Sequence, residues 1–100
     1  MKLENKVVII TGAGSGIGAA TAKLFGTHGA TVVVSDINLE KAKKIVSQIK
    51  KGGGTALAIK TDVTEFEEVE SLIVTTVKEY GRLDVMINNA GIGGKQQLKT

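Results

Sequence analysis

The sequence predicts an α/β fold: half of a doubly wound domain, with a parallel sheet and three helices. Two observations carry this prediction. Short β-branched runs alternate with segments whose apolar residues recur at helical spacing, which is typical of βαβ units. Glycines or a helix-start signal mark the change from one segment to the next. Because crossovers between parallel strands are right-handed, we expect the strand order 3-2-1-4.

Local signals place the four strands and the first two helices. We expect strands at residues 6–11, 31–35, 55–60 and 83–88. The first helix should run over about 17–28, where Gly29 stops it, and the second over about 39–51, before three glycines. The lysines of the second helix alternate with apolar positions, which indicates an amphipathic helix with a solvated outer face.

The third helix has a more specific start signal. Thr64 and Glu67 have the T-x-x-E spacing of a capping box, in which each side chain bonds the backbone N–H of the other residue. Apolar residues then recur at three- and four-residue spacing before Gly81, and we expect them to form its buried face: Phe66, Val69, Ile73, Val77 and Tyr80.

Composition limits the functions that the chain can have. Its 100 residues make one domain, 1–100, with no cysteine and one histidine, His28, so we expect no disulfide and no metal site. The net charge of +3 arises largely from the second helix, so we expect no nucleic-acid partner. No apolar stretch reaches the length of a membrane span and the start is charged, so we expect a cytoplasmic protein without membrane contact.

A glycine-rich loop follows the first strand directly and leads into the first helix: Gly12-Ala13-Gly14-Ser15-Gly16-Ile17-Gly18. Such a loop lets a pyrophosphate approach the main chain and meet the N–H groups that begin the helix. The spacing fits two dinucleotide-binding patterns, and a tight turn that binds nothing would use the same glycines. A P-loop is excluded because no Lys-Ser or Lys-Thr pair follows.

Three more segments end strands at the same expected sheet edge. Asp36 can accept hydrogen bonds from the adenosine ribose, which favours NAD and disfavours NADP, since a 2′-phosphate would meet a like charge. Asp62 and Val63 could contact the adenine amino group, and Asn88-Asn89-Ala90-Gly91 could approach a cofactor ribose. The amides of Asn88 and Asn89 could also bridge loop backbones. Structural alternatives remain: a helix cap for Asp36, which Asn38 could equally provide, a turn for Asp62 and a purely structural role for Asn88.

Together these sites resemble the short-chain dehydrogenase/reductase family. Residues 11–18 are similar to its T-G-x-x-x-G-I-G motif, Asp36 to its NAD-selecting acid, Asp62-Val63 to its adenine-ring pair and residues 88–91 to its N-N-A-G motif. The resemblance implies a Rossmann fold, a nicotinamide cofactor and hydride transfer between an alcohol and a carbonyl. The candidate cofactor-binding residues are Gly12, Ser15, Gly16, Ile17, Gly18, Asp36, Asp62, Val63, Asn89, Ala90 and Gly91.

The family's catalytic Ser, Tyr-x-x-x-Lys pair and helix-borne Asn lie beyond the N-N-A-G segment, and the sequence contains none of them. The one tyrosine, Tyr80, has Asp84 rather than Lys four residues on and the phase of a core residue. We therefore expect a cofactor-binding N-terminal half of an oxidoreductase, without a catalytic residue, that binds NAD weakly and does not catalyse alone.

The fourth strand has no further neighbour in this sequence. We expect it to associate through that edge, either as a homo-oligomer or with a missing C-terminal half. The alternative to an oxidoreductase segment is a non-enzymatic half-Rossmann module, natural or engineered, that self-associates through the same edge.

Overall fold

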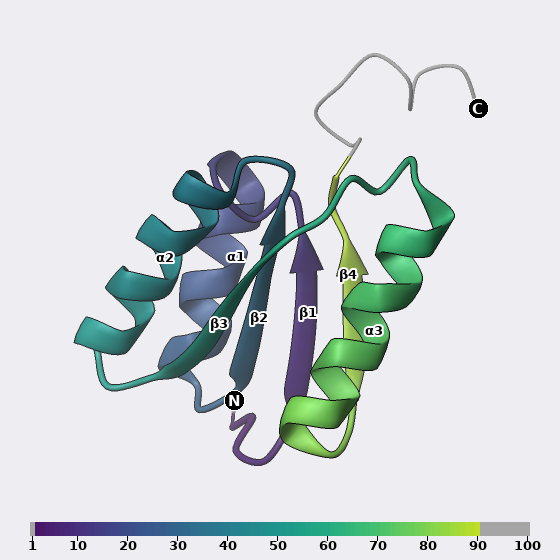
Figure 1. The fold of residues 1–100 in the computed structure, drawn as a ribbon. Helices are drawn as coiled ribbons and strands as arrows, with labels where there is room; N and C mark the ends of the chain where they lie inside the picture. The colour runs from purple at the N-terminus through teal and green to yellow at the C-terminus, as the bar shows by residue number, and fades with distance from the viewer. Residues whose placement is uncertain (1, 91–100) are drawn as a thin grey trace.

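The computed structural model describes residues 2–90, in which a four-stranded parallel sheet carries three helices. The elements are β1 (Val7–Thr11), α1 (Gly16–Thr27), β2 (Thr31–Asp36), α2 (Leu39–Lys51), β3 (Thr55–Lys60), α3 (Phe66–Tyr80) and β4 (Val85–Asn88). The strand order is β3-β2-β1-β4. Figure 1 shows α1 and α2 together on one face of the sheet and α3 on the other. The predicted half of a doubly wound Rossmann fold is therefore confirmed.

The two central strands are buried on both faces. Every residue of β1 is buried, and so are the four central residues of β2. Val8 and Val34 belong to the core on the side of α1 and α2, whereas Ile9 and Val33 pack with Leu72 of α3. This two-sided burial explains why these strands read as continuous apolar runs rather than as alternating patterns.

At the amino end of the sheet, Asp84 joins β1 to the start of β4. Its carboxylate accepts the backbone N–H of Val7 at 2.8 Å, and its own N–H donates to the Val7 carbonyl at 2.9 Å. Arg82 donates two hydrogen bonds to the same carboxylate, at 2.9 and 2.8 Å. The Arg82 hydrogen bond and the Val7 N–H hold the pKa of Asp84 below its ordinary value.

The start of α3 differs from the prediction. The N-cap residue is Glu65 and no side chain caps the helix, so the predicted capping box is wrong. The hydroxyl of Thr64 donates to Asp62 at 2.6 Å, and its backbone N–H donates to the same oxygen at 3.0 Å. Thr64 is therefore held in a turn by an aspartate two residues earlier, a local bond that competes with helix capping.

The predicted buried face of α3 is also wrong in part. Leu72 and Thr76 are buried, whereas Val77 is exposed and Phe66 is 77% exposed. Ile73 and Tyr80 are half-buried and pack against the core on this face, as expected.

Element ends differ from the prediction by one or two residues. β1 begins at Val7, β2 extends to Asp36 and β4 begins at Val85, while α1 begins at Gly16 and ends at Thr27. Such end residues depend on which backbone groups pair, and local patterns do not determine this. Within residues 2–90, no helix is both long and apolar enough to cross a membrane.

Candidate functional site

Three glycines between the end of β1 and the first turn of α1 have geometric reasons to be glycine. Gly12 and Gly16 have φ angles of 63° and 60°, in the left-handed region that residues with side chains rarely adopt. Gly18 is buried in the first turn of α1, where an added Cβ would overlap the carbonyl oxygen of Gly12 and approach the side-chain nitrogen of Asn89 at 2.5 Å. The loop is thus folded tightly against the loop that follows β4.

The amino end of α1 is open to an incoming anion. Its N-cap residue, Ser15, makes no side-chain cap bond, and the first turn contains no acidic residue. Ser15 and Gly16 are exposed, and Ile17 is 75% exposed. By contrast, Asn38 caps α2 by accepting the N–H of Lys41 at 3.1 Å. The first-turn N–H groups of α1 therefore present the positive end of a helix dipole to solvent, an arrangement that suits a phosphate.

Asp36 lies beside this loop and uses both carboxylate oxygens. One accepts the N–H of Gly14 at 2.9 Å, and the other accepts the N–H of Asn38 at 2.9 Å. Because Asn38 is the N-cap of α2, the interpretation of Asp36 as that cap is wrong. The sequence did not predict the Gly14 bond, which depends on how the loop lies over β2, or the place of Lys60 opposite Asp36, which depends on the β2–β3 register.

The loop after β4 is bonded to the end of β1. The hydroxyl of Thr11 donates to Asn88 Oδ1 at 2.9 Å and accepts the N–H of Ala90 at 3.0 Å. Asn89 Nδ2 donates to the carbonyl of Gly12 at 3.1 Å. Asn89 thus bridges to the glycine loop, as expected, whereas Asn88 bonds the last residue of β1. Gly91, the last predicted residue of this segment, lies outside the described residues.

Asp62 and Val63 follow β3 at the same sheet edge, and both are half-buried. Two hydrogen bonds lower the pKa of Asp62: the larger effect comes from the hydroxyl of Thr64 and the smaller from its backbone N–H. The carboxylate therefore stays ionised. The N–H of Thr61 donates to the carbonyl of Asp36 at 3.0 Å, which joins this segment to the end of β2. The structure thus gathers the glycine loop, Asp36, Asn89 and Ala90 at one sheet edge. Oδ1 of Asp62 accepts two hydrogen bonds from Thr64, and the contact of Asp62 with adenine stays a prediction.

Two further features of the described residues bear on catalysis: the tyrosine and the possible metal ligands. Tyr80 is half-buried. Its burial, and to a smaller extent the negative charge of the nearby Glu79, raise the pKa of its phenol, whereas a general acid requires a lowered pKa. Within residues 2–90 no group of three or more His, Asp or Glu side chains could hold a metal ion.

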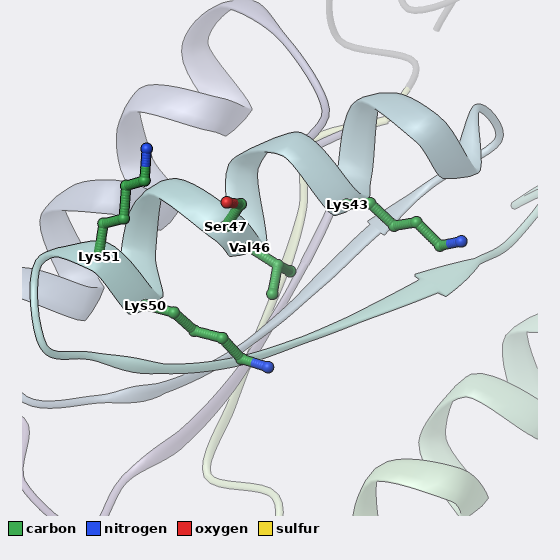
Figure 2. A pocket seen from close by; sticks show the side chains of 5 residues that line it. All are labelled: Lys43, Val46, Ser47, Lys50 and Lys51. Atoms are coloured by element: carbon green, nitrogen blue, oxygen red, sulfur yellow. The ribbon is translucent and has the colours of Figure 1, made fainter.

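A shallow hollow along α2 is lined by one core residue and four polar or charged ones. Figure 2 shows its lining: Lys43, Val46, Ser47, Lys50 and Lys51. Lys50 and Lys51 are in the last turn of α2, at the far end of the helix from Asn38. Lys43 lies 3.8 Å from Glu40, both well exposed, so this face has the solvated character that the sequence predicts.

Comparison with known proteins agrees with this arrangement. Residues 6–100 match the family model described as short chain dehydrogenase. The chain belongs to the short-chain dehydrogenase family, as its motifs indicate.

Particular relatives within that family are dehydrogenases. The chain is 45% identical to the 7α-hydroxysteroid dehydrogenase of Escherichia coli K12 over 94 residues, and 49% identical to the cyclohexanol dehydrogenase of Acinetobacter sp. SE19 over 94 residues. These matches cover 94% of this chain but only 37% and 38% of the two relatives. One solved structure that the chain resembles is a 7α-hydroxysteroid dehydrogenase complexed with NADH and 7-oxo glycochenodeoxycholic acid. The two superpose with a TM-score of 0.89 at 45% sequence identity. The match covers 93% of this chain and 36% of that one.

Proposed function

We propose that the carboxyl edge of this sheet binds NAD(H), with the pyrophosphate against the first turn of α1. The observation that carries the proposal is the uncapped start of α1 behind a glycine loop. An added Cβ at Gly16 would meet no atom within 4 Å, so the surface there is open where a pyrophosphate would lie. The family relative solved with NADH supports the same class of ligand.

The other predicted residues surround this position. Asp36 accepts hydrogen bonds from the adenosine ribose, Asp62 and Val63 contact the adenine, and the segment of Asn89 and Ala90 approaches a cofactor ribose. NAD binds better than NADP because a 2′-phosphate would approach the Asp36 carboxylate.

We assign the whole protein to hydride transfer between an alcohol or carbonyl substrate and the nicotinamide, which supplies the redox chemistry when bound. The role of the described residues is to bind and orient that cofactor at the sheet edge. None of them is assigned a catalytic role, and the cytoplasmic location expected from the sequence remains a prediction.

Calorimetric titration with NAD, NADP and ADP tests this proposal. The chain supplies contacts mainly for adenosine and pyrophosphate, so we expect a dissociation constant on the order of millimolar and similar affinities for NAD and ADP. Asp36→Ala and Gly16→Val should abolish binding, the latter because a β-branched side chain would fill the pyrophosphate position and would strain the backbone at its φ of 60°. A wild-type chain that does not bind NAD rejects the proposal, and NAD binding far tighter than ADP binding rejects the expected half-site.

We also propose that the chain alone self-associates through β4, one of the two edge strands of the sheet in Figure 1. Val85 on this strand is 41% exposed, and Met86 and Ile87 are only half-buried. An edge strand with apolar side chains is a template for pairing with another chain. Light scattering should show a dimer that weakens in Val85→Lys, whereas a monodisperse monomer over a wide concentration range rejects this association.

A further inference from the structure

We infer that Asp36 positions the pyrophosphate-binding loop, in addition to its proposed contact with the ribose. This inference rests on the proposed function. The carboxylate accepts the N–H of Gly14 at 2.9 Å, and Gly14 is buried in the middle of the glycine loop. The other carboxylate oxygen holds the N–H of Asn38, so one side chain joins the loop to the β2–α2 turn.

Two adjacent residues of the loop are fixed to two adjacent residues of β2. The N–H of Ala13 donates to the carbonyl of Ser35 at 2.9 Å, next to the bond from Gly14 to Asp36. The packing leaves no spare room, because a Cβ added at Gly14 would lie 2.8 Å from Asp36 Oδ2 and from the Cβ of Lys41. Removing the carboxylate would therefore release the Gly14 amide and open space beneath the loop.

The charge of Asp36 means that the two possible roles predict opposite changes in pyrophosphate affinity when the side chain is removed. A carboxylate beside an anion site repels a pyrophosphate, so a side chain that served only the ribose would weaken pyrophosphate binding. Removing it would then strengthen binding of a pyrophosphate that has no ribose. If Asp36 holds the loop in the shape that binds phosphate, its removal weakens binding despite the loss of negative charge.

The test titrates inorganic pyrophosphate into the full chain and follows the amide resonances of the glycine loop by NMR. Asp36→Ala should raise the dissociation constant by about three- to tenfold, the range expected for losing one loop-ordering hydrogen bond. Asp36→Asn, which keeps an oxygen acceptor without the charge, should bind pyrophosphate at least as tightly as wild type.

Glu40→Ala is the matched control, because Glu40 is an exposed carboxylate in the first turn of α2 and lies outside the site. It removes the same charge and should not weaken pyrophosphate binding. Hydrogen exchange at the Gly14 amide provides a readout that needs no ligand. The exchange should be about tenfold faster in Asp36→Ala and unchanged in Glu40→Ala.

Equal or tighter pyrophosphate binding by Asp36→Ala overturns the inference, as does unchanged exchange at Gly14 or a wild-type chain that does not bind pyrophosphate. Failure of the proposed function is seen separately, as absence of NAD binding by the wild-type chain. Thermal unfolding of each variant verifies that a change in binding comes from a folded protein.

Discussion

The side chain of Asn89 donates to the carbonyl of Gly12 across 77 positions of sequence. The same separation joins Thr11 to Asn88 and, at the other end of the sheet, Val7 to Asp84. It equals the offset of the parallel β1–β4 pairing. A single register therefore aligns the two loops of the candidate site and the Asp84 contact.

Gly18→Ala should destabilise the fold by about 1–3 kcal/mol, because the new methyl group would overlap the Gly12 carbonyl and displace the Asn89 amide. Gly52→Ala is the matched control. Gly52 has a φ of −83°, and an added Cβ there would make only ordinary contacts, at 3.6 and 3.8 Å. The control should change stability by no more than about 0.5 kcal/mol in urea unfolding. Equal effects of the two substitutions would contradict the close approach at Gly18.

Thr11→Val should cost about 1–3 kcal/mol, because the buried hydroxyl bonds both Asn88 and the N–H of Ala90, and valine leaves these groups without that partner. Thr11→Ser keeps the hydroxyl and should recover most of this loss. Chemical denaturation of the three proteins measures the difference. If valine and serine behaved alike, the hydroxyl network would not stabilise the loops.

The stabilising contribution of Asp84 should depend on pH. Its pKa is lower in the folded protein than in the unfolded chain, so the unfolded state binds the proton more readily. The stabilisation is fully present above the unfolded pKa and is lost as the pH falls through the lowered folded pKa. Urea unfolding of wild type and Asp84→Asn from about pH 7 to about pH 3 should show a stability gap that narrows with acid. A difference in stability between the two proteins that did not change with pH would mean that the Arg82–Asp84 charge pair contributes nothing to folding stability.

Asn38→Ala should destabilise α2 by about 1 kcal/mol, since the side chain accepts the N–H of Lys41 at the helix start. Asn38→Asp keeps the acceptor and should be close to wild type. Thermal unfolding monitored by circular dichroism compares the three proteins. A neutral effect of alanine would indicate that water replaces the cap at this exposed site.

Much of the fold could be predicted from residue pattern, because β-branched runs, helical spacing and glycine stops are local signals. The prediction failed at Thr64 because another local pattern was followed instead of the capping box: the hydroxyl and the backbone N–H of Thr64 both donate to Asp62 and hold Thr64 in a turn before the helix. Gly14, although within the motif, was not expected to bond Asp36, since that contact depends on how the loop lies over β2.

The sequence by itself determined the order of strands and helices, the place of the glycine loop between the first strand and the first helix, and the motif residues at the sheet edge. Only the tertiary structure decided which of these residues contact one another. Strand register and loop packing bring together groups that are distant along the chain, such as Asn89 and Gly12, and a hydrogen bond depends on that spatial arrangement rather than on any local pattern.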